Sequence, residues 1–240
     1  EGAPIMPING IPMRREESAC LSLTLRIWQL PYAKVLYLDS DMLVLRNIDD
    51  ILRNKEDFSA NYDSGIGDAR EFNGGMFLCS PSQDTFEWLL VLFSRIWPQA
   101  LPWDRSKRSG PDYRGAQEFL NQAFPACASP AARGGCWHDT LGQAQNVFAR
   151  NLMAGDFDIN GIESLHYSGD WAMAVKPWMK GCMQPSDSVG KSSDAQRTRL
   201  VCLWRRAYSA AAPLLERFGL ALLKTDCELS NPGLDCGRYR

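Results

Sequence analysis

The stretch LRIWQLPYAKVLYLDSDMLVLRNIDDIL, residues 25–52, contains the pattern that determines the fold class. Its first residues end a segment, 16–30, in which apolar side chains recur at helical spacing, and Pro31 terminates the expected helix. Four apolar residues without polar interruption follow at 35–38, which is typical of a short strand buried on both faces of a sheet. A second apolar run, 42–45, predicts another strand.

The two apolar runs are separated by Asp39, Ser40 and Asp41. In α/β proteins, ligands bind at the carboxyl ends of the strands, where this Asp-x-Asp pair is expected to lie. Two carboxylates one residue apart can reach one cation, and hard oxygen ligands suit Mg²⁺ or Mn²⁺ shared with substrate phosphates. The alternative is a plain turn, which also favours Asp and Ser. The buried strand that precedes the pair favours the metal interpretation.

Strand-like and helix-like patterns alternate along the rest of the chain, which predicts an α/β fold. We expect further strands at 57–61, 76–79 and 161–167, and helices that begin at Ser80-Pro81, at 115 and at Ser193. The 240 residues fit one domain with a small appendage. We therefore expect a catalytic domain at 1–180, followed by a linker and C-terminal helical region at 181–240.

Composition excludes several function classes. The 26 basic and 28 acidic residues give a net charge of −2, without the basic excess that binds a nucleic-acid backbone. No run reaches the ~20 apolar residues that span a bilayer. The eight cysteines include two pairs that close short loops and are disulfide candidates, which slightly favours an oxidising secretory compartment; these are Cys127 with Cys136 and Cys227 with Cys236. Cys79 is expected to be a buried thiol.

Two further groups of residues carry polar chemistry. Phe72-Asn73-Gly74-Gly75 precedes an expected strand, and its glycines allow a ligand to approach the backbone while the Asn amide can bind sugar hydroxyls. Its alternative is an ordinary turn. His166 ends the strand expected at 161–167 and can complete a metal shell, whereas His138 lies in a loop and is interpreted as a surface residue. Lys176 can meet a phosphate.

Together these groups provide what diphosphate release from a sugar nucleotide needs: a dication, a hydroxyl-binding turn and a late His/Lys pair. At this point the chain resembles glycosyltransferase family 8, the glycogenin-like transferases. The similarity extends over roughly 14–180, through the quoted stretch, the FNGG segment, Gly115-x-Gln117 with FLN, HYSG at 166–169 and KPW at 176–178. Residues 193–208 also resemble plant members, which include glucuronosyltransferases.

The resemblance implies a single GT-A domain, a Rossmann-like α/β fold. It also implies retaining transfer of glucose or glucuronate from a UDP-sugar, usually with Mn²⁺. Carried onto this chain, the metal ligands would be Asp39, Asp41 and His166, and the catalytic residues Gln117 and Lys176. The donor-binding residues would be Arg15, Ser40, Asn73, Gly74, Gly75, Gly169 and Lys176.

The chain departs from the family pattern at some positions. Ala116 stands where the family usually has Asp before the Gln, and Thr24 stands where a Lys is usual. Glu118 or Asp112 are candidates to replace the missing carboxylate. The family's first strand and uridine-binding segment would precede this sequence, so we expect an N-terminally incomplete domain.

These departures leave alternatives open. The chain could be a degenerate member that binds nucleotide or glycan without turnover, or a phosphohydrolase with Asp39 as nucleophile. The acceptor could be a glycan, a protein or a lipid, and a homodimer is compatible with the sequence. Glycogenin-like relatives are cytosolic and the plant glucuronosyltransferases are Golgi proteins.

Overall fold

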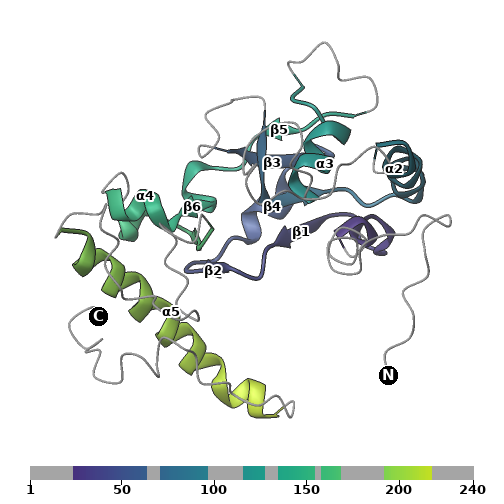
Figure 1. The fold of residues 1–240 in the computed structure, drawn as a ribbon. Helices are drawn as coiled ribbons and strands as arrows, with labels where there is room; N and C mark the ends of the chain where they lie inside the picture. The colour runs from purple at the N-terminus through teal and green to yellow at the C-terminus, as the bar shows by residue number, and fades with distance from the viewer. Residues whose placement is uncertain are drawn as a thin grey trace. The chain divides into compact units, whose positions relative to one another are not determined.

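The computed structural model describes residues 24–63, 71–96, 116–127, 135–154, 158–168 and 192–217 (Figure 1). The chain forms two compact units. The first unit comprises residues 1–39 and 49–142, and the second comprises 40–48 and 143–240. Each unit combines strands with helices, so the predicted α/β class is confirmed. No helix in the described ranges combines the length and the apolar character that crossing a membrane requires.

The first unit is built on a four-stranded sheet in the order β1-β4-β3-β5. Strand β4 is antiparallel to both of its neighbours, and β3 runs parallel to β5. The strands are β1 (Val35–Leu38), β3 (Phe58–Tyr62), β4 (Phe72–Cys79) and β5 (His138–Asp139). The strands expected from apolar runs at 35–38, 57–61 and 76–79 are therefore present.

Two strand expectations need correction. All four residues of β1 are half-buried rather than fully buried, because β1 lies at the end of the sheet order and pairs only with β4 among the described strands. The segment Phe72–Gly75, expected as a turn before a strand, is the first half of β4 itself. The pairing of β3 with β4 is irregular between Ala60 and Tyr62, beside this Gly-containing half.

A side-chain cap determines where helix α2 (Gln83–Ile96) of the first unit begins. Helix α2 begins after Ser82 rather than at Ser80-Pro81, because the Ser82 hydroxyl accepts the Thr85 N–H at 3.0 Å. The 3₁₀ turn η2 (Arg26–Gln29) ends at an extended Leu30, as its position before a proline requires. The remaining helical elements are η3 (Asp49–Arg53) and α3 (Ala116–Ala123).

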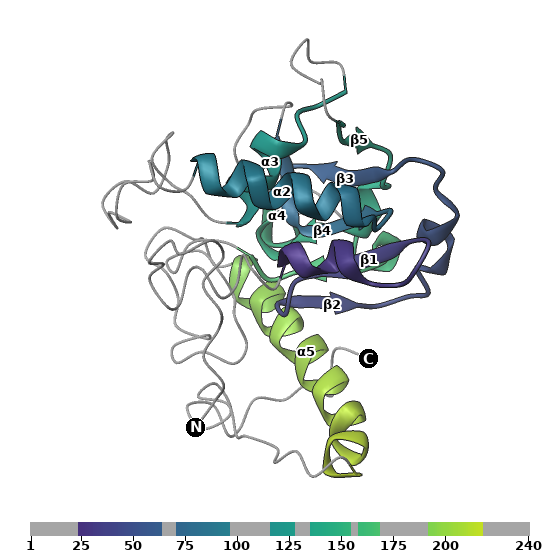
Figure 2. The same cartoon turned by 90° about the vertical axis from the view of Figure 1, so that its right-hand side faces the viewer.

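An aromatic cluster forms the core between this sheet and its helices. Figure 2 shows helices α2 and α3 packed over one face of the sheet. The Trp28 ring stacks on Phe58, Phe77 and Phe124, with centroid distances of 6.1, 6.0 and 5.7 Å. On the sheet, Phe58 and Phe77 belong to residue rows that face the helices. Helices α2 and α3 contribute further buried side chains: Phe86, Leu89, Phe93, Phe119, Leu120 and Ala123.

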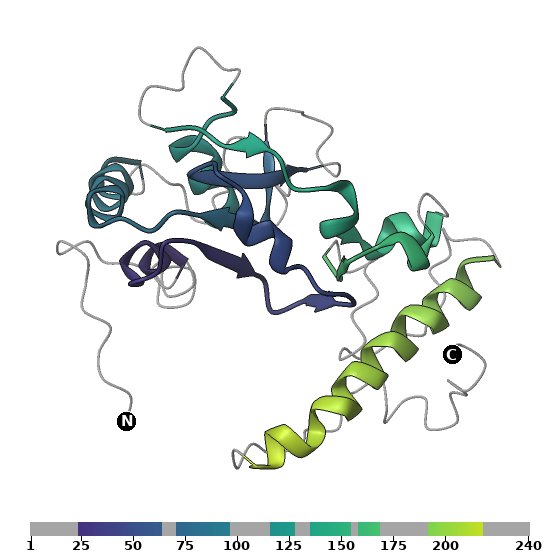
Figure 3. The same ribbon diagram turned by 180° about the vertical axis from the view of Figure 1, so that it is seen from behind.

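The second unit has a three-stranded sheet in the order β2-β7-β6, with helices α4 and α5 (Figure 3). Strand β7 is antiparallel to β2 and parallel to β6. The elements of the second unit are β2 (Met42–Val44), η5 (Gln143–Gln145), β6 (Val147–Phe148), α4 (Ala149–Ala154), η6 (Ile159–Gly161), β7 (Ser164–His166) and α5 (Ser192–Arg217). The expected strands at 42–45 and 161–167 and the helix from Ser193 are confirmed.

Tyr167 connects this sheet to helix α5. Its side chain is 1% exposed and packs with Leu165, Leu200 and Val201. Its hydroxyl donates to the Leu200 carbonyl at 2.9 Å, and burial raises the pKa of this hydroxyl well above its usual range. The Tyr167 ring therefore anchors the helix by packing and by one hydrogen bond.

The cysteines follow the sequence expectation in part. Cys127 and Cys136 form a disulfide, and Cys79 is a free, fully buried thiol whose pKa burial raises to about 12. Cys202 is disulfide-bonded as well, which the sequence did not indicate. The expected pair Cys227 and Cys236 lies outside the described residues.

Replacing Trp28 with Ala is expected to lower the free energy of unfolding by about 3–5 kcal/mol, because it empties the centre of the aromatic cluster. Denaturant unfolding followed by circular dichroism measures the loss. Val91→Ala is the control: Val91 is 46% exposed on α2, so a change within about 0.5 kcal/mol is expected. Equal effects of the two substitutions would contradict this account of the core.

Candidate metal and donor site

His166 and Asp41 face each other in the second unit. Met42, the first residue of β2, pairs with His166 at the end of β7. Asp41 precedes Met42, and its carbonyl oxygen accepts the Tyr167 N–H at 2.9 Å, which extends the pairing by one step. The His166 Nε2 atom lies 3.2 Å from the Asp41 Oδ1 atom, and the side chains are 3% and 16% exposed.

The hydrogen bonds of His166 decide what this pair can bind. Its Nδ1 atom lies 3.1 Å from the Asn146 side-chain oxygen, and in the tautomer that carries the proton on Nδ1 this nitrogen donates to that oxygen. In neutral imidazole the Nε2 atom then presents its lone pair to the Asp41 carboxylate. Two electron-rich atoms at that distance are stable only with a proton or a cation between them. Orientation of a metal-ligating His by an Nδ1 hydrogen bond is a usual arrangement.

Asp39 lies directly after β1, a strand of the sheet of the first unit. Its N–H donates to the Gly75 carbonyl at 2.8 Å, directly after the Leu38–Met76 pair of β1 and β4. The Tyr37 hydroxyl donates to the Asp39 Oδ1 atom at 2.5 Å, and the Tyr37 ring stacks on Phe77. One carboxylate of the Asp-x-Asp pair is thus fixed by its own strand. Ser40 is exposed in the turn that follows.

Gln117, on the first turn of α3, is held by a backbone N–H and a side chain of β4 and by the side chain of the residue after β3. Its amide nitrogen donates to the Asp63 Oδ2 atom at 3.0 Å. Its oxygen accepts the Gly74 N–H at 2.8 Å and the Asn73 amide at 3.4 Å. Asn73 also donates to Asp63 at 3.3 Å and accepts the Gly75 N–H at 3.0 Å. These contacts join the predicted site residues Gln117, Asn73, Gly74 and Gly75 to Asp63 in one network.

The approach of α3 to β4 explains why Gly74 is a glycine. A Cβ atom at Gly74 would lie 3.0 Å from the Gln117 Cβ and 3.3 Å from its Cα. Asn121, one turn further along α3, accepts the Phe72 N–H at 2.8 Å and donates to the Phe72 carbonyl at 2.9 Å. The Asn121 amide therefore binds the backbone of β4 as a neighbouring strand would, and holds the helix close.

Asp63 is the functional candidate that sequence reasoning missed. It is 5% exposed and contacts Gln117, whereas Ala116 offers no carboxylate at the position where the family usually has Asp. Its position directly after a strand and before Ser64-Gly65 is the same signal that drew attention to Asp39. Among the other predicted residues, Arg15, Gly169, Lys176 and Asp112 lie outside the described part of the chain.

Comparison with known proteins identifies relatives over most of the chain. Glycogenin-1 of Oryctolagus cuniculus is 40% identical over 213 residues, which cover 87% of this chain and 58% of that protein. Human glycogenin-1 is 29% identical over 228 residues, covering 91% of this chain and 57% of that protein. The chain is thus similar in sequence to glycogenins over most of its own length. It spans somewhat more than half the length of these glycogenins.

A plant protein belongs to the same set of relatives. The putative UDP-glucuronate:xylan alpha-glucuronosyltransferase 3 of Arabidopsis thaliana is 38% identical over 227 residues, covering 85% of this chain and 30% of that protein. No family model matches the chain. Among solved structures, the galactosyltransferase LgtC with donor and acceptor sugar analogs has a TM-score of 0.46 and 17% identity over 79% of this chain and 70% of that one. The homology and the mixed α/β sheets agree with the predicted GT-A fold class.

Gly74→Ala is expected to destabilise the first unit by about 1–3 kcal/mol, because the Asn121 hydrogen bonds prevent α3 from moving away from the added methyl group. Thermal unfolding measures the effect. Gly161→Ala is the matched control, since no atom lies within 4 Å of a Cβ built there. A Gly74 variant as stable as the Gly161 variant would show that α3 is not held against β4.

Proposed function

We propose that this chain carries the metal and donor site of a retaining glycosyltransferase that moves glucose or glucuronate from a UDP-sugar to a glycan, protein or lipid acceptor. The observation that carries the proposal is the Asp41–His166 pair, in which a carboxylate oxygen and an imidazole nitrogen face each other at 3.2 Å. The homologues of this chain include glycogenins and proteins named UDP-glucuronate:xylan glucuronosyltransferases. These relatives favour the transferase over the phosphohydrolase that Asp39 and Asp41 also allow.

Asp39 is proposed as the third metal ligand. Only Ser40 separates it from Asp41, so the two Cα atoms are at most about 7.6 Å apart whatever the conformation of the turn. Two carboxylates suit Mg²⁺ or Mn²⁺, and an added imidazole nitrogen favours the transition metal. We therefore propose Mn²⁺ as the preferred ion.

The cation would neutralise charge that develops on the UDP leaving group as the anomeric bond breaks. The residues of the chain then have separate tasks. Asp39, Asp41 and His166 hold the ion, and Lys176 adds a positive charge at the diphosphate. The remaining donor contacts are proposed for Arg15, Ser40, Asn73, Gly74, Gly75 and Gly169.

Gln117 is proposed to lie beside the transferred sugar. Its amide is fixed on one side by Asp63 and on the other by the Gly74 N–H, at 3.0 and 2.8 Å. A side chain held at both ends presents an oriented dipole without the entropic cost of ordering it during the reaction. We propose that Asp63 supplies this orientation.

Asp41→Ala is expected to abolish metal-dependent UDP release from the preferred UDP-sugar, because it removes the ligand that faces His166. UDP release is measured across a panel of UDP-sugars with Mn²⁺ and with a chelator. Asp84→Asn, at an exposed carboxylate in the first turn of α2, is the control and should retain activity. Full metal-dependent release by a correctly folded Asp41 variant would overturn the metal assignment.

A non-catalytic binding role is the second candidate, and Ala116 is the observation that favours it. The family position before Gln117 usually carries a carboxylate, and this chain has a methyl group there. If Asp63 does not replace that carboxylate, the site would bind a nucleotide without turning it over. Metal-dependent UDP binding without UDP release from any donor is the signature of this role.

Ala116→Asp distinguishes these roles. If the missing carboxylate limits the reaction, the variant is expected to raise the rate of UDP release by about a hundredfold, the lower end of the range for a placed acid or base. Glu118→Ala is a useful companion, since it tests the neighbouring carboxylate considered from the sequence. An Ala116 variant with unchanged release and unchanged UDP affinity would mean that this position does not limit activity.

A further inference from the structure

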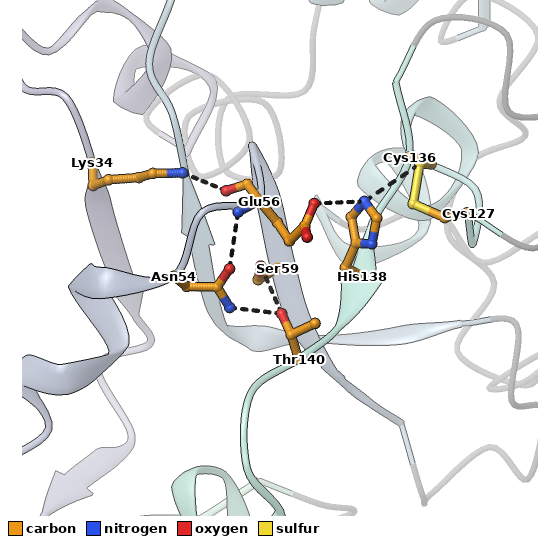
Figure 4. A network of polar contacts seen from close by, with 8 residues as sticks. All are labelled: Lys34, Asn54, Glu56, Ser59, Cys127, Cys136, His138 and Thr140. Carbon is orange, nitrogen blue, oxygen red and sulfur yellow. Dashed lines mark hydrogen bonds and ion pairs between the residues drawn. A yellow bond between two sulfur atoms is a disulfide. The ribbon is translucent and has the colours of Figure 1, made fainter.

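A second group of metal-ligating side chains belongs wholly to the first unit. Figure 4 shows His138 of β5 between the Glu56 carboxylate and the disulfide of Cys127 and Cys136. The His138 Nε2 atom lies 3.1 Å from the Glu56 Oε2 atom and 3.9 Å from the Cys136 Sγ atom. His138 was interpreted from the sequence as a surface residue in a loop. It lies in the short strand β5 instead, and its side chain is 35% exposed beside Glu56, a contact that the sequence did not indicate.

Backbone hydrogen bonds join the segments that carry these side chains in addition to the disulfide. The Cys127 N–H donates to the Trp137 carbonyl and the Trp137 N–H donates to the Pro125 carbonyl, both at 3.2 Å. These bonds form the bridge between Ala126 and Trp137, which places the two cysteine-bearing segments side by side. Reduction of the sulfur–sulfur bond would therefore leave both thiols near the His138 ring.

Polar contacts fix the Glu56 side of the group. The Asn54 side chain accepts the Glu56 N–H at 2.9 Å and donates to the Thr140 hydroxyl at 2.7 Å. Thr140 donates to the Ser59 hydroxyl at 2.9 Å, and Lys34 donates to the Glu56 carbonyl. Asn54 therefore connects Glu56 to Thr140, and Thr140 lies two residues after His138 (Figure 4).

We propose that reduction of the Cys127–Cys136 disulfide converts this group into a four-ligand site for a thiophilic divalent cation such as Zn²⁺, with Cys127, Cys136, His138 and Glu56 as ligands. Tetrahedral zinc with usual bond lengths places S and N ligands ~3.6 Å apart and N and O ligands ~3.3 Å apart. The observed separations are 3.9 and 3.1 Å. The ligand atoms of Cys127, Cys136 and His138 all lie within 4.8 Å of one another. In the reduced chain the two sulfur atoms would move apart and the Glu56 carboxylate, already beside His138, would move toward them to complete the shell.

Access and charge are compatible with metal entry. The side chains of His138 and Glu56 are 35% and 41% exposed, so a cation can reach the group from solvent. Two thiolates and one carboxylate around a neutral imidazole give a soft donor set, which prefers zinc to Mg²⁺ or Mn²⁺. This site would therefore differ in metal preference from the Asp41–His166 pair.

The chemistry requires an external two-electron reductant, and a dithiol is taken here as the example. The reductant supplies two electrons and two protons, the Cys127–Cys136 bond breaks to give two thiols, and the reductant becomes a disulfide. Metal binding then displaces the two thiol protons to solvent, while His138 binds as the neutral imidazole. The disulfide and the metal are mutually exclusive. A reducing environment would therefore favour the metal, and an oxidising one the disulfide, as the link between the segments that carry Cys127 and Cys136.

The test is cobalt and zinc binding by the whole chain, oxidised and after reduction with a phosphine that carries no thiol. Co²⁺ is the probe, because thiolate coordination gives a charge-transfer band that Zn²⁺ abolishes on displacement. The reduced chain is expected to show this band at one equivalent, and the oxidised chain is expected to lack it. Absence of the band in the reduced, folded chain would overturn the proposal.

Variants assign the band to this group, because reduction also frees other cysteines. The double variant Cys127→Ser, Cys136→Ser should lose it, and His138→Ala or Glu56→Gln should weaken zinc binding by about tenfold or more. Cys79→Ser and Asp41→Ala are controls that should leave it unchanged. Full-strength cobalt or zinc binding in the double variant, or in both single variants, would place the metal elsewhere and overturn the proposal.

Discussion

The first unit depends on strand β4, which is paired on both edges and buried along almost its whole length. Its second half, Met76–Cys79, binds β1 on one side and β3 on the other, and Phe77 lies in the aromatic core. Its first half, Phe72–Gly75, carries Asn73 and Gly74 and receives the Asp39 N–H at Gly75. The same strand therefore fixes the core, the end of β1 and the position of Gln117.

Much of this arrangement could be predicted from the sequence, because short apolar runs determine strands directly. The strands at 35–38 and 58–62 and the end of β7 at His166 needed only local patterns. The Asp-x-Asp pair was recognisable for the same reason, since it follows such a run. Homology to the glycogenins then supports the class of fold that those patterns indicated.

What the sequence could not provide depends on pairing between distant residues. Asn and Gly are poor strand formers, so Phe72–Gly75 looked like a turn, and only its partners in β3 and α3 make it a strand. Apolar runs alone do not distinguish a strand at the end of a sheet from a central one, hence the wrong expectation of full burial for β1. The contacts of Asp63 and His138 were not predicted because Gln117 and Glu56, which make them, lie far along the chain.

The link between Tyr167 and helix α5 connects the C-terminal region to chemistry at the neighbouring residue. Tyr167 follows His166 directly, bonds the Asp41 carbonyl through its N–H and holds the Leu200 carbonyl through its hydroxyl. Any ion bound by Asp41 and His166 would restrict the backbone to which the helix is anchored. Ion binding and helix docking are then thermodynamically coupled, and the coupling is reciprocal. If Asp41 and His166 bind an ion, a change in the docking of α5 would therefore change the affinity of that site.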